Sequence, residues 1–276
     1  MLNIFVISSQ VSYGHVGLNA ILPAVQALGH EVFALPTVIL SNHPGHRFAS
    51  GEQVSPITLE EMVTALDDNG WLSAIDRILT GYMPSVEHVN FAAETIIRIK
   101  SKSPGVEVIC DPIIGDDSEG VYIDIEAAVA IRERLVPLSN MMLPNNFELS
   151  WLSEVDIKNE RDVLLAARAF PETSVLVTSV PTYEHDIMAN ILSPCDLSVN
   201  VARSCCFKVY SDVPKGTGDF FSGLIAAGAT FDVATAQTSA LARLSVGKPH
   251  LDIILQRTSW ISAKPSTLVP VEFKIT

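Results

Sequence analysis

The stretch PKGTGDFFSGLIAAGA, residues 214–229, places a glycine turn and one carboxylate before a run that is apolar apart from Ser222 and its glycines. A helix that is hydrophobic all round belongs in a protein interior. Gly216 and Gly218 let the backbone approach an anion closely, because no side chain intervenes. The free N–H groups of the first helical turn would face the same point. The stretch therefore predicts a buried helix whose N-terminus can cradle phosphate charge.

Asp219 stands directly beside this predicted cradle. In that place a carboxylate can accept the proton of an attacking hydroxyl group. An Asp at a helix N-terminus also commonly serves as a simple cap, and for an isolated GxGD the cap is the more frequent role. The stretch alone leaves both roles open.

Apolar strand-like segments alternate with helical patterns along most of the chain. Strands are predicted at 3–8, 31–36, the second half of 74–82, 106–112, 141–145, 174–179 and 186–193. Helices are predicted at 17–30, 58–66, 124–135, 160–170 and 233–244. Strands separated by helices in this way indicate a mostly parallel sheet with helices on both faces. With no repeat or long linker in the chain, we expect one three-layer α/β/α domain over residues 1–276.

Capping residues predict where three of these helices begin or end. Thr58 and Glu61 have the spacing of a capping box, and Asp124 is a good N-cap. Gly29 follows the last periodic residue of the first helix, as a C-terminal glycine cap does.

The composition excludes several classes of protein. Hydrophobic residues make up 48% of the 276 residues and charged residues 18%, which allows a large core. The net charge of −13 argues against a nucleic-acid partner, since phosphate neutralisation needs clustered Lys and Arg. The opening MLNIFVISSQ lacks the basic region of a signal peptide, and no apolar run reaches the length of a membrane span. We expect a cytoplasmic protein with no membrane association.

Polar residues follow the apolar segments at the predicted strand ends. In open α/β sheets ligands bind beyond the carboxyl ends of the strands. The residues in this position are Ser8, Ser9, Thr37, Gly81, Tyr82, Asp111, Asn145, Glu148, Thr178 and Ser179. They predict a site assembled from the tips of several strands.

GTGDFFSG resembles the anion-hole and catalytic-aspartate motif of the ribokinase superfamily. Other segments are similar, in order, to the successive motifs of the pyridoxal kinases. They are SSQVSYGHVG (8–17), TVILSNHPG (37–45), LTGYMPS (79–85), DPIIGDDSEG (111–120) and LPNNFELSWL (143–152). The superfamily has no Walker loop, and the chain contains no GxxxxGK[ST]. The resemblance covers nearly the whole chain and implies the Rossmann-like ribokinase fold.

This resemblance implies an ATP-dependent kinase of vitamin B6 salvage. Such enzymes phosphorylate the 5′-hydroxymethyl group of pyridoxal, or of the related pyridoxine and pyridoxamine, and pyridoxal gives pyridoxal 5′-phosphate. Asp219 would be the catalytic base, and Gly216, Thr217 and Gly218 would form the anion hole. Asp111 and Glu148 would serve Mg²⁺, the second of them through water. The resemblance also implies a homodimer.

The remaining contacts are implied residue by residue. The B6 vitamer would meet Ser9, His43, Pro44, Gly45, Tyr82 and Asp219. ATP would meet Asp111, Leu143, Glu148, Thr178 and residues 216–218, and the segment with Asp116 and Tyr122 would fold over the nucleotide. Read without the resemblance, Glu148 is equally a first-turn helix carboxylate and Asp111 a turn residue before a proline.

Gln10 departs from the family pattern, which commonly has His after the substrate serine. Gln can form hydrogen bonds but cannot carry a charge, so the preferred vitamer is left open. Two alternatives remain within the same fold. One is a kinase for hydroxymethylpyrimidine or a sugar, although hydroxymethylpyrimidine kinases typically have Cys at the position of Asp219. The other is a vitamer-binding protein without catalysis.

Overall fold

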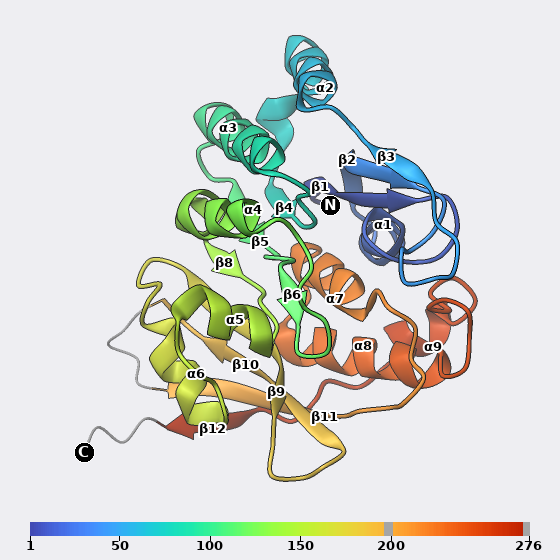
Figure 1. Ribbon diagram of the computed structural model, residues 1–276, viewed down its shortest axis with the longest axis vertical. Coiled ribbons are helices and arrows are strands. Elements are labelled where there is room, and N and C mark those ends of the chain that lie inside the picture. Colours follow the sequence, from blue (N-terminus) through green and yellow to red (C-terminus); the bar gives the residue numbers. More distant parts are fainter. Residues whose placement is uncertain (196–200, 273–276) are drawn as a thin grey trace.

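The computed structural model describes residues 1–195 and 201–272. Its centre is one ten-stranded sheet in the order β12-β11-β10-β9-β8-β5-β4-β1-β2-β3 (Figure 1). The parallel part consists of β1 Asn3–Val11, β2 Glu31–Leu40, β4 Arg77–Thr80, β5 Glu107–Cys110, β8 Met141–Met142 and β9 Ser174–Pro181. The predicted mostly parallel sheet is confirmed in this central part.

Antiparallel strands extend the sheet at both ends. β3 Gly51–Gln53 pairs with β2, and β10 Ile187–Ser193, β11 Val201–Lys208 and β12 Val269–Glu272 follow β9. A separate two-stranded hairpin, formed by β6 Gly115–Asp116 and β7 Gly120–Val121, follows β5 in the chain. The pattern did not predict β3, β12 or this hairpin, because each is too short to show a period of two, and it did not predict β11 because VARSCCFK does not alternate.

Helices cover both faces of the sheet (Figure 1). On one face lie α2 Pro56–Asp68, α3 Val86–Lys102, α4 Ile125–Ala130, α5 Asn146–Ser153 and α6 Glu160–Ala167. On the other lie α1 Leu18–Ala27, α7 Thr217–Ala226, α8 Phe231–Leu244 and α9 Arg257–Ile261. Short 3₁₀ turns at Trp71–Ala74 and Val136–Leu138 and a π turn at Ile131–Leu135 complete the helical parts. No helix within the described residues is both long and apolar enough to traverse a bilayer.

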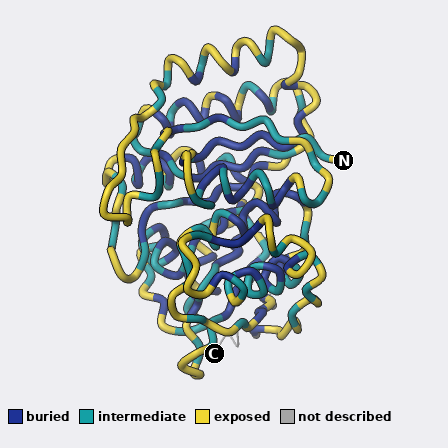
Figure 2. The backbone as a smooth tube through the Cα atoms, turned by 90° about the vertical axis from the view of Figure 1, so that its right-hand side faces the viewer, coloured by how far each residue is buried: buried dark blue, intermediate teal, exposed yellow. Residues whose placement is uncertain are grey.

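The core is divided by the sheet into two apolar layers. Along β1, Phe5 and Ile7 belong to the layer under α2–α6, whereas Ile4 and Val6 belong to the layer under α1 and α7–α9. This alternation follows from the period of two in a strand. Figure 2 shows the buried strands enclosed between helices whose outer surfaces are exposed.

Helix α7 is the buried helix that residues 214–229 predict. Its residues Phe220–Ala226 are all buried, and it packs against α1 and α8. Phe220 meets Trp260 of α9 edge to face, with ring centroids 4.9 Å apart. A Cβ at Gly223 would lie 3.1 Å from the Ile21 Cα, so this glycine permits the close approach of α1.

Two local predictions need correction, and two are confirmed. α2 begins at Pro56 and its N-cap is Ser55, whose Oγ accepts the Thr58 N–H at 3.1 Å, so Thr58 is not the N-cap. Pro56 at the first helical position fixes this earlier start. The β1 strand does not end at Ser8 but continues to Val11. Asp124 does cap α4, and Gly29 has the positive φ of a residue that ends a helix.

Candidate active site

Three carboxylates lie close together beyond the carboxyl end of β5. Asp111 follows β5, Glu148 is in the first turn of α5, and Asp219 is in the first turn of α7. Burial raises the pKa of Asp111 well above its usual range, and the negative charges of Glu148 and Asp219 raise it further. Because such repulsion acts only over short distances in a protein, the predicted catalytic and metal-binding residues share one site.

Glu148 is held in place by backbone N–H groups. Its Oε1 accepts from Ile114 at 2.9 Å and Gly115 at 3.4 Å, and its Oε2 accepts from Asn145 at 2.8 Å. The Asn145 side chain accepts the Glu148 N–H in return, which completes a capping box. Burial raises the pKa of Glu148 to about 8, although the three hydrogen bonds oppose the rise. Glu148 is therefore a helix cap and a member of the acidic cluster at once.

Asp219 is partly buried at the start of α7. Burial raises its pKa to about 6, and a hydrogen bond from the Gly17 backbone N–H opposes the rise. Its neighbour one turn along, Ser222, forms a hydrogen bond with the Asp219 carbonyl oxygen at 3.0 Å. The Ser222 hydroxyl also lies against Asp111 and counteracts part of the rise in that pKa. A carboxylate with a pKa near neutrality is suited to accepting a proton at physiological pH.

The two glycines of the turn have different roles. Gly216 is the N-cap of α7 with φ 110°, and a Cβ there would overlap the backbone oxygen of His15. Gly218 has nothing within 4 Å of the place where a Cβ would be. Gly216 therefore lets the turn pack closely against the backbone of His15, whereas Gly218 leaves an open approach to the N-terminus of α7.

Ser9 contacts Gly17, and the backbone of Gly17 in turn contacts Asp219. The β1–β2 register shifts between Ser8 and Gln10, so Ser9 lies in a bulge, which redirects side chains within a strand. A Cβ at Gly17 would overlap both the backbone and the hydroxyl oxygen of Ser9. The predicted vitamer contact thus adjoins the backbone that donates to the predicted base.

Charged loops converge beside the glycine turn. Lys215 forms ion pairs with Asp116 at 3.0 Å and Glu119 at 3.5 Å, both on the β6–β7 hairpin. Burial alone would raise the pKa of Asp116, but hydrogen bonds from Ser118 and Lys215 outweigh it and lower the value to about 2. Burial and the nearby Lys215 charge lower the pKa of His43, so the loop that carries it lies in the same region.

The other predicted residues differ in how they face the site. Pro44 and Gly45 are exposed beside His43, and Gly45 N–H donates to its Nδ1 at 3.0 Å. Tyr82 is half-buried, which raises its pKa, and the Thr37 hydroxyl donates to its carbonyl oxygen at 2.8 Å.

On the nucleotide side, Thr178 lies next to Asn145 through an isolated β-bridge. The Leu143 side chain is buried in the core. Its backbone N–H donates to Cys110 O at 2.8 Å, which ties it to the end of β5. Partial burial and the negative charge of Glu148 raise the pKa of Tyr122, although 45% of this residue stays exposed.

Sequence reasoning missed Lys215, Ser222 and Gly17 as parts of the site. A single cation inside the glycine turn was a usable signal for Lys215, and the position three residues after Asp219 was one for Ser222. Nothing local distinguishes Gly17, because its role depends on residues of β1 and α7.

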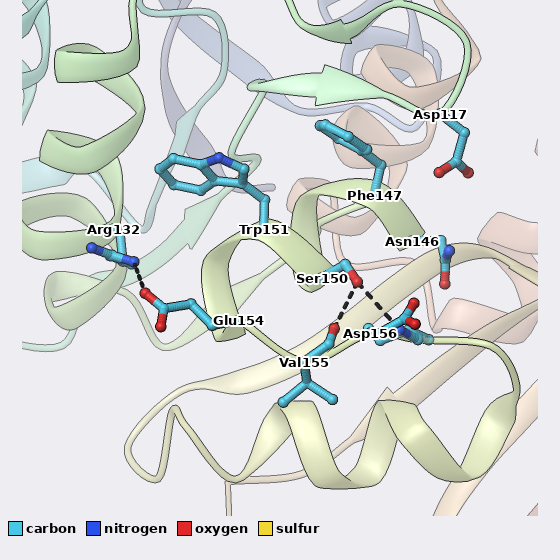
Figure 3. Close-up of a pocket in the computed structure, with 10 residues that line it drawn as sticks. Asp117, Arg132, Asn146, Phe147, Ser150, Trp151, Glu154, Val155 and Asp156 are labelled. Atoms are coloured by element: carbon cyan, nitrogen blue, oxygen red, sulfur yellow. Dashed lines mark hydrogen bonds and ion pairs between the residues drawn. The ribbon is translucent and has the colours of Figure 1, made fainter.

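A pocket of about 620 Å³ lies along α5, and none of the three clustered carboxylates lines it. Phe147 and Trp151 project from α5 beside it, and Arg132 pairs with Glu154 at 3.0 Å (Figure 3). The Phe147 ring also packs against Gly115 at the base of the β6–β7 hairpin, where a Cβ would lie 2.6 Å from it. Phe147, which lines the pocket, therefore also supports the hairpin.

Comparisons with known proteins agree with this fold. The phosphomethylpyrimidine kinase family model matches residues 12–242. A pyridoxine/pyridoxal/pyridoxamine kinase of Bordetella avium is 34% identical over 78% of this chain and 73% of its own length. A pyridoxal kinase of Corynebacterium diphtheriae is 33% identical over 65% of this chain, and the match spans only 64% of that protein.

A solved structure of the pyridoxal kinase from Leishmania donovani, in complex with ADP and pyridoxine, has the same fold. It aligns with a TM-score of 0.88 over 98% of this chain and 99% of that one, at 25% identity. The expected ribokinase-type architecture is confirmed. The chain belongs to the pyridoxal kinase family.

Proposed function

We propose that this protein is an ATP-dependent kinase that phosphorylates the 5′-hydroxymethyl group of pyridoxal or a related B6 vitamer. The observation that carries the proposal is the start of α7. Asp219, with a pKa of about 6, stands there beside the open face of Gly218 and the free N–H groups of the helix. A proton acceptor and an anion cradle are thus side by side.

In this reaction the vitamer hydroxyl oxygen attacks the γ-phosphorus of ATP, and the bond from that phosphorus to the bridging oxygen of ADP breaks. The hydroxyl proton passes to the Asp219 carboxylate. The backbone N–H groups around Gly216, Thr217 and Gly218 stabilise negative charge on the transferred phosphoryl group. Phosphoryl transfer depends mainly on positioning and charge stabilisation, so few reactive side chains are needed.

We assign the two substrates to opposite sides of Asp219. Ser9, the 43–45 loop and Tyr82 would hold the vitamer, and Asp111, Leu143, Glu148, Thr178 and the glycine turn would hold ATP. The bulge that brings Ser9 to Gly17, next to the Asp219 carboxylate, supports the vitamer side. The ligands in the Leishmania donovani structure, ADP and pyridoxine, are of the same two classes.

Mg²⁺ fits this arrangement if it is held largely through water. Glu148 uses three of its four lone-pair positions for backbone N–H groups, which leaves one for a metal-bound water. Within residues 1–195 and 201–272, no three or more His, Cys, Asp or Glu side chains are arranged to hold a metal directly. Asp111 and Glu148 would therefore face the hydrated ion, which when bound would offset the charge of the phosphates.

A hydroxymethylpyrimidine kinase is the second candidate, because the matching family model carries the description phosphomethylpyrimidine kinase. Asp219 stands where such enzymes typically have Cys, which favours the B6 vitamers. The homodimer, the cytoplasmic location and the single domain over residues 1–276 remain predictions.

The test is an assay of ADP formation with pyridoxal, pyridoxine, pyridoxamine and hydroxymethylpyrimidine as separate acceptors, with Mg²⁺ and with EDTA. We expect Mg²⁺-dependent turnover with at least one B6 vitamer and less with hydroxymethylpyrimidine. Faster turnover of hydroxymethylpyrimidine would establish the second candidate. Calorimetric binding of a vitamer with no ADP formed from any acceptor would reduce the protein to a vitamer-binding protein.

A further inference from the structure

The loop of residues 12–17, which joins β1 to α1, contacts three separate parts of the proposed site. Its Gly17 adjoins Ser9, and the Gly17 N–H donates to Asp219. The backbone oxygen of His15 lies so close to Gly216 that a Cβ there would overlap it. The position of this loop therefore sets the position of the base, the anion turn and the substrate serine together.

A histidine side chain ties this loop to a distant part of the chain. The His15 ring is half-buried, and its Nδ1 forms a hydrogen bond with the Leu251 carbonyl oxygen, 236 residues away in sequence. A carbonyl oxygen can only accept, so Nδ1 carries the proton. The His15 ring also meets His250 edge to face at 4.7 Å.

Leu251 also contacts the glycine turn directly, through its side chain. A Cβ at Gly216 would lie 3.3 Å from the Leu251 Cδ1, on the same side as the backbone oxygen of His15. Gly216 is therefore enclosed by the two residues that the histidine bond joins. On its other flank the loop is held by Asn19, whose amide donates to Val11 O at 2.6 Å and Gly14 O at 3.3 Å.

We propose that His15 is a positioning residue for phosphoryl transfer. By joining loop 12–17 to Leu251, it holds Gly17 against Asp219 and closes the wall behind Gly216. This rests on the proposed kinase function, and it assigns His15 a role in the geometry of the reaction without contact to either substrate. The bond acts on the base and the anion turn at once, so its loss is expected to lower kcat more than substrate affinity.

Three variants at one position test the proposal. His15→Ala removes the bond, His15→Asn keeps an amide N–H near the position of Nδ1, and His15→Gln displaces it toward Nε2. We expect kcat of the Ala variant to fall roughly 10- to 100-fold, because small misplacements at a reacting centre have effects of this size. The KM values and the dissociation constant of ADP should change by less than about threefold. The Asn variant should recover most of kcat, and the Gln variant should not.

His30→Ala is the matched control, since His30 also forms a hydrogen bond with the backbone, from Leu2 N at 3.0 Å, and lies beyond the C-terminal end of α1, whereas Gly17 is at its start. Its kcat should equal that of the wild type. Wild-type kcat in His15→Ala, or equal losses in the Asn and Gln variants, would overturn the proposal. If the Ala variant does not fold, the comparison of Asn with Gln decides alone.

Amide hydrogen exchange separates this proposal from the proposed function. His15→Ala should speed exchange in residues 214–219, whereas His30→Ala should not. If the wild type phosphorylates no acceptor, the kinase function fails, and exchange still reports whether His15 orders the turn. Unchanged exchange at 214–219 in the Ala variant would refute the positioning role whatever the substrate is.

Discussion

Asp219→Asn is expected to lower the rate of turnover and, at the same time, to raise the free energy of unfolding. The pKa of Asp219 rises from an ordinary 3.8 to about 6, chiefly through burial. Each pKa unit corresponds to about 1.4 kcal/mol, so ionised Asp219 lowers the free energy of unfolding by up to about 3 kcal/mol. The value is an upper bound because the side chain keeps some contact with solvent. An amide removes this cost, and its Oδ1 can still accept the Gly17 N–H.

The effect must depend on pH with a defined sign. A raised carboxyl pKa gives the folded state a relative advantage that is complete below pH 3.8 and is lost as the pH rises through 6. The variant should therefore exceed the wild type in stability most clearly at pH 8 and by about half as much at pH 5. Urea unfolding at the two pH values measures this difference. Asp68→Asn, at an exposed position at the end of α2, is the control and should show no such change.

Turnover of Asp219→Asn should fall by roughly 10² to 10⁴, the usual contribution of a positioned general base. The variant should bind ADP as the wild type does, which calorimetry can measure. Turnover equal to the wild type would reduce Asp219 to a helix cap. A variant that is less stable than the wild type at pH 8 would show that burial does not raise this pKa.

Four further substitutions address the metal, the turn and the hairpin. Glu148→Gln should raise the Mg²⁺ concentration for half-maximal turnover roughly tenfold, and an unchanged Mg²⁺ titration would remove Glu148 from the metal site. Gly216→Ala should destabilise the fold by about 1–3 kcal/mol in thermal unfolding. Gly218→Ala should fold normally but lose turnover, so equal stability losses at both glycines would contradict the assigned roles. Lys215→Ala should raise KM for ATP several-fold by releasing Asp116 and the hairpin, and a KM that stays constant would show the ion pairs to be unimportant.

The parts of the fold that the sequence predicted are those that depend on local pattern. The apolar run 220–229 indicates a buried helix in any context, and α7 is one. Asp124 and Gly29 mark helix ends because their effects reach only one turn. Ser55 competes with Thr58 only three residues away, and the proline after it decides the outcome. Such signals need no knowledge of distant residues.

The parts that could not be predicted depend on contacts between distant segments. The bulge at Ser9 follows from how β1 pairs with β2, not from the sequence of β1 alone. The bond between His15 and Leu251 joins residues that nothing local relates. The ion pairs of Lys215 require the hairpin to fold back over the turn. The candidate residues could thus be named from motifs, whereas their mutual support could not.

The acidic cluster raises the question of how a chain of net charge −13 can present carboxylates to an anionic substrate. The cation nearest to the turn, Lys215, is already paired with the hairpin, so the balance must come mainly from fixed dipoles. Three backbone N–H groups hold Glu148, one holds Asp219, and the N-terminus of α7 faces the open side of Gly218. Backbone donors keep their protons and cannot move independently of the fold. The charge balance of this site is therefore set by backbone geometry, which is why a residue that only places the backbone, such as His15, is expected to govern turnover.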